Sequence, residues 1–435
     1  MKKFISILLA ACTLLVPSTS FAQAIDENVL KEHVEIRDQN IYVPTRNGVQ
    51  RATYEEAIKI DKFNKMGLEE LTGSYILGDY KSGEILEGYN IDEVRAMAST
   101  SKLVAVFVVL DKIKDGTISR DDIVKIDHEC SSLTGSTYKL KENEEITVDD
   151  LLKASLVVSG NDAITALGKH VSGTKEGFVN MMNKKCKELG LTNAHMVNPT
   201  GLTDYSIEDY NKMTTREMFI LTRELIRTHP NILQLTSIQE LNKTDREYHE
   251  YNTNPLLGVV EGIDGLKTGY TNAAGRCLIA TGLKNGAEDG STKDIRLIGV
   301  TTGSKGDWQR YSASRRLMED GFKNYSYIPV NNLEDIVTKV NIEGCSEEET
   351  NVYPKEIGTA LWDNKTEIST KVNIRKNLKA PLPAGEIVGE VSYYMGDKEV
   401  FKTDLVLTNS ASEKGFLFKI QNICENIFYN IRNAA

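Results

Sequence analysis

The 435-residue sequence predicts an α+β fold, in which a domain of helices and strands is followed by a small all-β domain and a C-terminal amphipathic helix. Residues 75–327 mix helical and strand patterns, which is typical of an α+β domain. Residues 330–408 carry short Val- and Ile-rich stretches separated by turn residues, which predict a sheet domain. The last 20 residues repeat apolar side chains at helical spacing.

The bulk composition is that of a globular chain of more than one domain. With 40% hydrophobic and 26% charged residues, the chain is neither disordered nor fibrous. Its length exceeds what one hydrophobic core usually serves. The net charge of −10 and the lack of a long Lys/Arg run argue against nucleic acid as the main partner.

The N-terminus reads as a secretory signal peptide. Lys2 and Lys3 precede an apolar run from Phe4 to Val16, whose 13 residues are too few to span a bilayer. Small residues before Ala24 fit cleavage after that residue, so the rest of the chain should work outside the cytoplasm. The segment ending at Cys12 also resembles a lipoprotein box, but further apolar residues follow this Cys, and we disfavour lipidation.

Cysteine and histidine spacings predict neither a disulfide framework nor a metal site. Five cysteines remain after the signal peptide, an odd and scattered set, so we interpret them as buried free thiols. They are Cys130, Cys186, Cys277, Cys345 and Cys424. The six histidines have no zinc-type spacing, and we expect no metal and no cofactor.

The first domain is expected to open with two strands and a buried helix. Apolar residues on both sides of an Asp79–Gly83 turn predict a hairpin. A continuous apolar run from Leu103 to Leu110, continued to Ile113 and closed by Gly116, predicts a buried helix of about four turns. Residues 54–71 show weak helical periodicity. Other helices are expected at 148–156, 162–170, 174–189, 214–228 and 312–322, and strands at 75–77, 84–86, 278–282 and 296–301.

The C-terminal helix should lie on a membrane surface. Its apolar stripe holds Phe416, Ile420, Ile423, Ile427 and Ile431. Sixteen helical residues rise roughly 24 Å, which is short of the ~30 Å hydrocarbon core of a bilayer. A Phe- and Ile-rich stripe of this length favours a helix lying in the membrane interface, and packing on the all-β domain is the alternative.

A Ser–x–x–Lys pair is the first motif with chemical meaning. It places a hydroxyl and an amine on one helix face, where a neutral amine can activate the serine. The pattern occurs three times, at Ser99/Lys102, Ser136/Lys139 and Ser172/Lys175. Only Ser99 and Lys102 precede a long apolar run that would bury the helix and hold the pair rigid. We therefore regard the other two pairs as incidental.

Two further motifs follow at fixed order. Ser159-Gly160-Asn161 lies 57 positions after Lys102, and Lys267-Thr268-Gly269 lies 106 positions after Asn161. The first alone could be a turn between helices, with Ser159 or Asn161 as an N-cap. The second resembles a strand edge of small residues, along which a ligand backbone can approach closely, and its cation could hold a carboxylate.

Together the three motifs resemble the low-molecular-mass penicillin-binding proteins, the serine-type D-alanyl-D-alanine carboxypeptidases. The resemblance extends over residues 75–407, where the chain also carries Asn-Pro-Thr-Gly-Leu at 198–202 and Asn-Thr-Asn at 252–254. It implies a penicillin-binding/β-lactamase-like domain, an antiparallel sheet flanked by helices. One departure is Met97, where many relatives have proline.

The resemblance implies a role for each motif residue. Ser99 would be the nucleophile, Lys102 its base, and Ser159 the relay that passes a proton to the leaving amine. Asn161 would hold a substrate amide and orient Lys102. Lys267 and Thr268 would bind the terminal carboxylate, Gly269 belongs to the same substrate-binding strand, and the N–H groups of Ser99 and Tyr270 would form an oxyanion hole.

The family implies peptidoglycan stem peptides and β-lactams as partners, and a place on the outer face of the cytoplasmic membrane, on the cell wall side. The expected segments are a signal peptide at 1–24, an extension at 25–70, the catalytic domain at 71–327, the all-β domain at 328–410 and a membrane-anchoring helix at 411–435. Alternatives on the same scaffold are a β-lactamase, a D,D-endopeptidase and a non-catalytic wall-binding protein.

Overall fold

The computed structural model describes residues 35–37, 40–45, 48–52, 54–205, 209–347 and 349–434. The predicted signal peptide at 1–24 lies outside the described residues. The chain divides into two compact units. The first unit extends to Lys284 and resumes at Arg296–Phe322, and the second holds Asn285–Ile295 and the residues from Lys323 onward.

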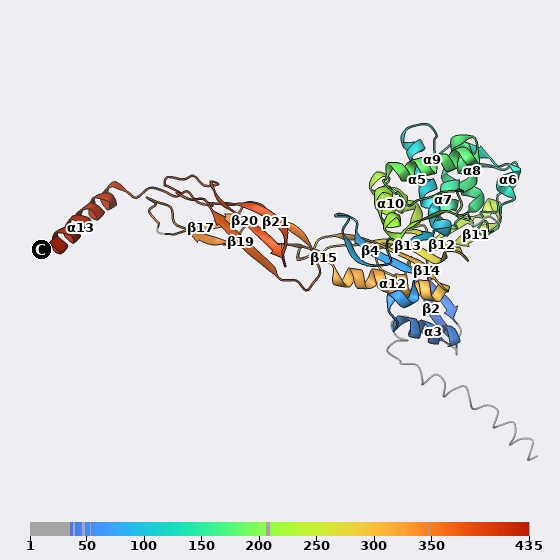
Figure 1. The fold of residues 1–435 in the computed structure, drawn as a ribbon, viewed down its shortest axis with the longest axis horizontal. Helices are drawn as coiled ribbons and strands as arrows, with labels where there is room; N and C mark the ends of the chain where they lie inside the picture. The colour runs from blue at the N-terminus through green and yellow to red at the C-terminus, as the bar shows by residue number, and fades with distance from the viewer. Residues whose placement is uncertain are drawn as a thin grey trace, which may run out of the picture. The chain divides into compact units, whose positions relative to one another are not determined.

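The first unit is built on a five-stranded sheet, in the order β12-β13-β14-β4-β5 (Figure 1). The strands are β4 (Ser74–Asp79), β5 (Ile85–Tyr89), β12 (Ile263–Thr271), β13 (Gly275–Lys284) and β14 (Ile295–Ser304). Neighbours β12 and β13, β14 and β4, and β4 and β5 pair antiparallel. The sheet joins β4 and β5 to strands that lie much later in the sequence, and the predicted α+β class is confirmed.

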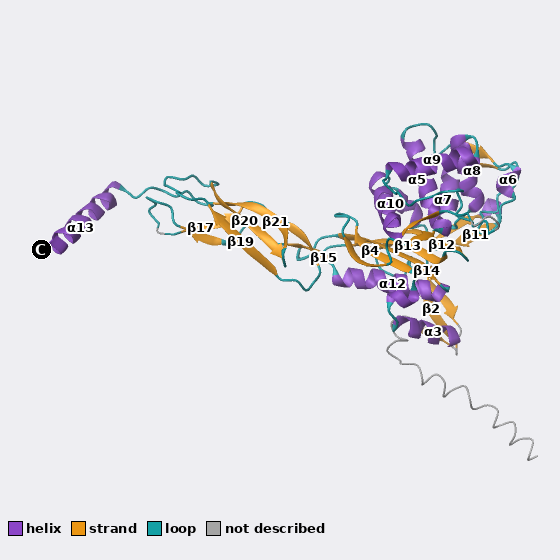
Figure 2. Ribbon diagram, in the orientation of Figure 1, coloured by secondary structure: helices purple, strands orange, loops and turns teal. Residues whose placement is uncertain are grey.

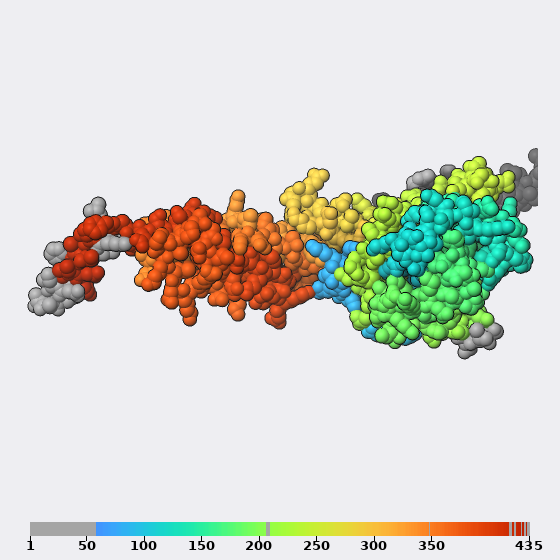
Figure 3. All heavy atoms as spheres, turned by 90° about the horizontal axis from the view of Figure 1, so that it is seen from above, coloured from blue at the N-terminus to red at the C-terminus, as the bar shows by residue number. Residues whose placement is uncertain are grey.

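Helices cover one face of this sheet. They are α5 (Lys102–Lys114), α6 (His128–Ser131), α7 (Val148–Val157), α8 (Asn161–Ser172), α9 (Lys175–Glu188), α10 (Thr215–Thr228) and α11 (Ile232–Thr236). This helical layer is purple in Figure 2 and forms the cyan-to-green surface in Figure 3. Helix α5 is its centre, because it packs against α7, α8, α9 and α10 and buries every residue from Lys102 to Leu110. The predicted buried helix is therefore present.

Helix α12 (Asp307–Asn324) covers the opposite face of the sheet. Glycines permit the close approach: an added Cβ on Gly299 of β14 would lie 2.6 Å from Met318 Sδ, and one on Gly321 would lie 2.8 Å from Leu77 Cδ2. The sequence predicted only the later part of this helix, from 312.

The N-terminal extension forms a small sheet and two helices. Strands β1 (Glu35–Arg37), β2 (Asn40–Thr45) and β3 (Gly48–Ala52) precede α3 (Tyr54–Asn64) and α4 (Leu68–Leu71). Residues 54–71, where the sequence shows only weak helical periodicity, form two separate helices, because Gly67 adopts an extended conformation and caps α4. From α12, Arg316 donates to the carbonyl oxygens of Phe63 and Met66 at 3.2 and 2.6 Å, which ties the end of α3 to the catalytic unit.

Short two-stranded pairs brace the loops between the helices. They are β6 (Val94–Ala96) with β9 (Lys212–Thr214), β7 (Ile123–Lys125) with β8 (Glu145–Thr147), and β10 (Glu240–Lys243) with β11 (Tyr248–Tyr251). Two 3-10 turns, η2 (Ala98–Ser101) and η3 (Thr244–Arg246), complete the unit. The first two pairs join segments far apart in the sequence, and none of the three was predicted.

The second unit is mainly antiparallel sheet. Its five strands lie in the order β16 (Thr338–Val340), β17 (Thr350–Pro354), β21 (Lys398–Val406), β20 (Ile387–Met395) and β19 (Ile368–Ile374). Strands β15 (Ser326–Pro329) and β18 (Thr359–Trp362) form a separate pair. Val352, Val388, Val391 and Leu405 are fully buried and form the core of the sheet.

Helix α13 (Phe416–Ala434) ends the second unit with an exposed apolar face. The exposed fraction is 78% for Phe416, 58% for Ile423 and 51% for Ile427. Of the helices in the described ranges, none combines the length and apolarity needed to cross a bilayer. The described stripe residues Phe416, Ile420, Ile423 and Ile427 therefore form an unburied surface of the helix.

The five cysteines in the described part of the chain are free thiols. Cys130, Cys186, Cys277 and Cys345 are buried, as predicted. Burial raises the pKa of Cys130 and Cys186 to about 12, so both stay protonated and behave as small apolar groups. The prediction of burial was wrong for Cys424, which is exposed on α13.

Candidate active site

Ser99 lies in the turn η2 that leads directly into α5. Its neighbours Ala98, Thr100 and Ser101 are buried, whereas Ser99 is partly exposed. The Thr100 hydroxyl donates to Met97 O at 2.6 Å, and the Ser101 hydroxyl donates to Ala98 O at 2.8 Å. These bonds hold Ala98 at a φ of 48°, a left-handed conformation that costs a non-glycine residue about 1–3 kcal/mol. The turn is thereby fixed with the Ser99 side chain facing outward.

Lys102 is fully buried and its amine reaches three oxygens. Nζ lies 2.9 Å from Ser99 Oγ, 2.7 Å from Asn161 Oδ1 and 2.7 Å from the Thr200 carbonyl oxygen. A carbonyl-type oxygen can only accept, so Asn161 and Thr200 take two N–H groups of Lys102. In a neutral amine the remaining lone pair then faces the Ser99 hydroxyl. Thr200 was not among the predicted site residues.

The surroundings favour the neutral form of Lys102. Burial, and secondly the cation of Lys267, hold the pKa of Lys102 well below its ordinary value of 10.5, while the Asp162 carboxylate acts against them. Burial and the Arg310 cation likewise lower the pKa of Lys267 to about 7. A buried amine of depressed pKa, in contact with a serine hydroxyl, is what base activation of a serine requires.

Ser159 and Asn161 lie where α7 passes into α8. Gly160, rather than either of them, is the N-cap residue of α8, and no side chain caps this end. The Asn161 amide instead spans the site: Oδ1 accepts from Lys102, and Nδ2 donates to Thr134 O at 2.8 Å. The backbone N–H of Asn161 donates to Ser136 O at 2.8 Å. The capping interpretation was therefore wrong, and both residues line the cleft described below.

Strand β12 supplies the opposite wall. Lys267 is fully buried and donates to Thr268 O at 3.0 Å. An added Cβ on Gly269 would lie 3.0 Å from the backbone nitrogens of Ser99 and Thr100, so only glycine lets the strand approach the nucleophile this closely. Tyr270 follows with 48% of its surface exposed.

A cleft of about 410 Å³ lies between these elements. Six predicted residues line it, namely Ser99, Ser159, Asn161, Thr268, Gly269 and Tyr270. Lys102 and Lys267 are buried, and Lys102 reaches Ser99 from within the fold. The sequence interpretation missed Gly135, Ser136, Leu202, Thr253, Arg276, Asp307 and Arg310, which also line the cleft.

The competing Ser–x–x–Lys pairs have other surroundings. Ser136 does line the cleft, through the loop that holds Asn161, but Lys139 lies 5.6 Å from the centre of the Tyr248 ring. The Ser172 hydroxyl donates to backbone carbonyls, and Lys175 pairs with Glu129 at 2.7 Å.

One end of the cleft gathers cations. The Arg276 guanidinium stacks 3.5 Å from the centre of the Tyr270 ring and contacts Asp307 at 3.2 Å. Arg310 contacts the same carboxylate at 3.0 Å, and its side chain is 11% exposed. With Lys267 nearby, this end can hold a carboxylate. No sequence pattern pointed to these three residues, because the helix was expected to begin after Asp307 and Arg310, and the strand after Arg276.

Known proteins share both units. The D-alanyl-D-alanine carboxypeptidase family matches residues 63–304, and the C-terminal domain of penicillin-binding protein 5 matches 325–413. The carboxypeptidase DacA of Haemophilus influenzae is 31% identical over 80% of this chain and 87% of its own. Penicillin-binding protein 5 of the same organism superposes with a TM-score of 0.59, at 28% identity over 79% of this chain and 98% of its own. Penicillin-binding protein D2 of Listeria monocytogenes, solved in its ampicillin-bound form, gives 0.51, at 31% identity over 58% of this chain and 97% of its own.

The fold and the Ser99–Lys102 pair define a serine acyl-transfer enzyme of the penicillin-binding type. Since the family match covers more than half of the sequence, the chain belongs to the D-alanyl-D-alanine carboxypeptidase family, as its motifs predicted. It is a low-molecular-mass penicillin-binding protein with serine carboxypeptidase chemistry.

Proposed function

We propose that this enzyme removes the terminal D-alanine from peptidoglycan stem pentapeptides through an acyl-enzyme on Ser99. The observation that carries the proposal is the buried Lys102 amine, which lies 2.9 Å from Ser99 Oγ while two carbonyl-type oxygens take its N–H groups. This arrangement supports a role for the amine as the group that accepts the Ser99 proton.

In the first step Ser99 Oγ attacks the carbonyl carbon between the two D-alanines, and its proton moves to Lys102 Nζ. The carbonyl oxygen becomes an oxyanion, which the N–H groups of Ser99 and Tyr270 would bind. The closeness of Gly269 to the Ser99 nitrogen supports this pairing. Each such donor is worth roughly 10²–10³ in rate.

Collapse of this intermediate breaks the C–N bond. The leaving amine takes a proton from Lys102 through the Ser159 hydroxyl, which borders the cleft beside Asn161. D-alanine departs and the remaining peptide stays esterified to Ser99. A water then attacks the ester and gives a proton to Lys102. Lys102 passes this proton to Ser99 Oγ as the ester bond breaks and the shortened peptide leaves.

The free carboxylate of the substrate marks it as a C-terminal peptide. The cationic end of the cleft, with Lys267, Thr268 and Arg310, would bind this carboxylate. A protonated Lys267 is needed for that contact, and a bound anion would stabilise its protonated form.

The test of the assignment is covalent labelling. A fluorescent penicillin should acylate the enzyme at Ser99, and Ser99→Ala should give no adduct. Slow release of the penicilloyl group is expected for a carboxypeptidase. Rapid turnover of penicillin would instead indicate a β-lactamase.

Export and membrane attachment belong to the same proposal. The signal-like residues 1–24 would direct the enzyme out of the cytoplasm, to the cell wall side of the membrane. The exposed apolar face of α13, with Phe416, Ile423 and Ile427, would bind the outer face of that membrane.

A further inference from the structure

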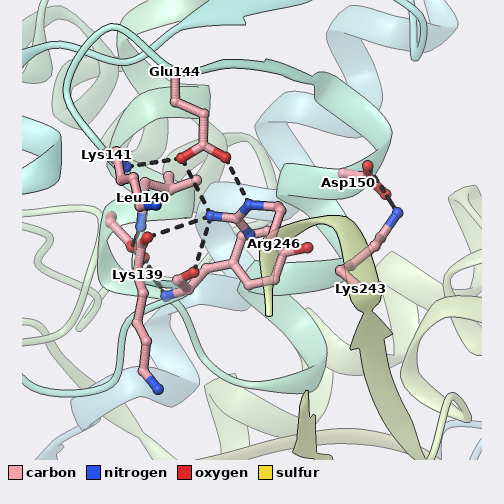
Figure 4. Close-up of polar contacts among 9 residues, drawn as sticks. Lys139, Leu140, Lys141, Glu144, Asp150, Lys243 and Arg246 are labelled. Carbon is pink, nitrogen blue, oxygen red and sulfur yellow. Dashed lines mark hydrogen bonds and ion pairs between the residues drawn. The ribbon is translucent and has the colours of Figure 1, made fainter. Parts of the chain in front are cut away.

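An arginine of the hairpin β10–β11 reaches the loop of residues 134–141 beside the cleft (Figure 4). Nε of Arg246 lies 2.7 Å from Oε1 of Glu144, and Nη2 lies 3.2 Å from Oε2. Nη2 also lies 3.4 and 3.3 Å from the carbonyl oxygens of Tyr138 and Lys139. The guanidinium of Arg246 thus binds both the loop and Glu144, which lies just beyond the end of the loop.

The contact is largely buried. The side chains of Arg246 and Glu144 are 16% and 19% exposed, so their attraction is less screened than that of a surface pair. The guanidinium also stacks 4.1 Å from the centre of the Tyr138 ring, which packs edge-on against Tyr248 of β11 at 4.6 Å. The second Glu144 oxygen accepts the N–H of Lys141 at 2.8 Å, which fixes the end of the loop.

The same loop holds Asn161. Carbonyl oxygens of Thr134 and Ser136 accept the side-chain and backbone N–H groups of Asn161, both at 2.8 Å. The Asp162 carboxylate accepts the N–H groups of Tyr138 and Leu140 at 2.9–3.1 Å. Because Asn161 Oδ1 accepts from Lys102, a continuous series of contacts leads from Arg246 to the base.

We propose that Arg246 is a positioning residue for acylation: it fixes the loop 134–141, and through the loop the Asn161 amide that orients Lys102. The inference rests on the proposed function of Ser99 and Lys102. Without Arg246 the loop loses the hydrogen bonds that the guanidinium donates to its carbonyl oxygens, and it loses the stacking contact on Tyr138. Asn161 then loses its fixed orientation, and water gains access to Lys102.

The test compares variants of two cations on the one hairpin. Arg246→Met removes the guanidinium and with it the contacts to Glu144 and to the loop. Lys243→Met removes an ion pair of 2.8 Å to Asp150 of α7, which anchors the hairpin away from the loop. Arg246→Met should lower the second-order rate of acylation by labelled penicillin about tenfold or more, since small misplacements of catalytic groups have effects of this order. Lys243→Met should stay within about twofold of wild type.

Two further variants separate positioning from folding. Arg246→Lys keeps the charge but loses the planar guanidinium and its stacking on Tyr138. Its acylation rate should therefore drop about as far as that of Arg246→Met. Glu144→Gln keeps the side-chain volume but loses the ion pair with Arg246. It should lower the acylation rate by less than Arg246→Met does. Glu144→Gln decides the matter if Arg246→Met does not fold.

The pH profile is the readout that a merely structural role would not move. Lys102 faces the Lys267 cation and the Asp162 carboxylate, and burial is the main cause of its low pKa. Water reaching Lys102 in Arg246→Met should raise its pKa and move the acid limb of acylation to higher pH, while Lys243→Met leaves the limb in place. A wild-type rate and profile in Arg246→Met, or equal losses in both variants, would overturn the proposal. A wild-type enzyme that fails to acylate would instead remove the proposed function.

Discussion

At the scale of single residues, Lys102 and Lys267 are two buried amines with different tasks. Both are fully buried, and each lies near a further cation that disfavours its protonation: Lys267 for Lys102, and Arg310 for Lys267. The arrangement keeps Lys102 neutral enough to act as a base. It also leaves Lys267 poised to be protonated when a carboxylate enters the cleft.

The depressed pKa of Lys102 predicts the pH dependence of acylation. Activity should fall as pH drops through the depressed pKa of Lys102, because the protonated amine cannot accept the Ser99 proton. Lys267→Met removes the neighbouring cation, so it should move this acid limb to higher pH, apart from any loss in rate. Penicillin acylation measured from pH 5 to 10 tests this. Lys112→Met, which removes a surface ion pair with Asp115, is the control. An unmoved limb in Lys267→Met would contradict the account.

A second prediction concerns stability. The pKa of Lys267 is about 7 in the folded chain and 10.5 as its ordinary value, so between these values the unfolded chain binds more protons. Unfolding free energy should therefore rise with pH across that window. Lys267→Met should raise Tm at pH 7 relative to wild type, and the gain should shrink by pH 10. Thermal unfolding at the two pH values measures this, and an equal gain at both would count against it.

The limits of residue-level prediction lie in contacts without a local pattern. Ser99, Lys102, Ser159, Asn161 and Lys267 could be predicted because their motifs have fixed spacings. Thr200 acts through a backbone carbonyl, which any residue carries. Arg276, Asp307 and Arg310 reach the cleft from β13 and α12, and only the folded sheet brings them together.

At the scale of elements, the turn that carries Ser99 depends on a glycine from a distant loop. Gly201 has a φ of +83°, and an added Cβ would lie 1.9 Å from the Ala98 carbonyl oxygen. Ala98 directly precedes the nucleophile. The Asn198–Leu202 loop and the turn η2 thus pack backbone against backbone, and the neighbouring Thr200 carbonyl reaches Lys102 from the same loop.

Gly201→Ala should therefore lower stability and acylation more than the same change at a glycine that has no close neighbour. Gly190 has a similar φ of +73° with nothing within 4 Å of an added Cβ, so Gly190→Ala isolates the conformational cost of about 1–2 kcal/mol. Gly201→Ala adds the clash with Ala98. It should lower Tm further and reduce acylation, whereas Gly190→Ala should acylate normally. Equal effects of the two changes on acylation would show that this contact does not position Ser99.

Elements with their own periodicity could be predicted, and those made by distant pairing could not. Helix α5 follows from its apolar run, and α10 from a helical pattern closed by His229 and Pro230. The strand pairs β6–β9 and β7–β8 have three residues each, too few for a periodic signal, and their partners lie far along the chain. The hairpin β10–β11, with charged residues on both strands, has no apolar alternation to reveal it.

At the scale of the whole molecule, the chain combines an acyl-transfer unit with a β-sheet unit that ends in an amphipathic helix. The apolar stripe of α13 could be predicted because helical periodicity is local. Its surface is exposed at Phe416, Ile420, Ile423 and Ile427, which is unusual for large apolar side chains grouped on one helix. Such a surface suits a lipid interface.

A single charge on this stripe should release the enzyme from membranes. Ile423→Asp places a carboxylate on the apolar face, while Asn426→Asp places the same charge off the stripe and serves as the control. Cosedimentation with phosphatidylglycerol vesicles should be lost in Ile423→Asp and kept in Asn426→Asp. D-alanine release in solution should match wild type in both. Vesicle binding by Ile423→Asp equal to the control would argue that α13 is not the membrane contact.

The most direct measurement is D-alanine release from a stem pentapeptide by the signal-free enzyme and its Ser99→Ala variant. The wild type should release one D-alanine per pentapeptide, and a Ser99→Ala variant with wild-type thermal stability should release none above background. Release that persists in Ser99→Ala, or its absence from a folded wild type, would contradict the assignment of Ser99 as the nucleophile of a carboxypeptidase.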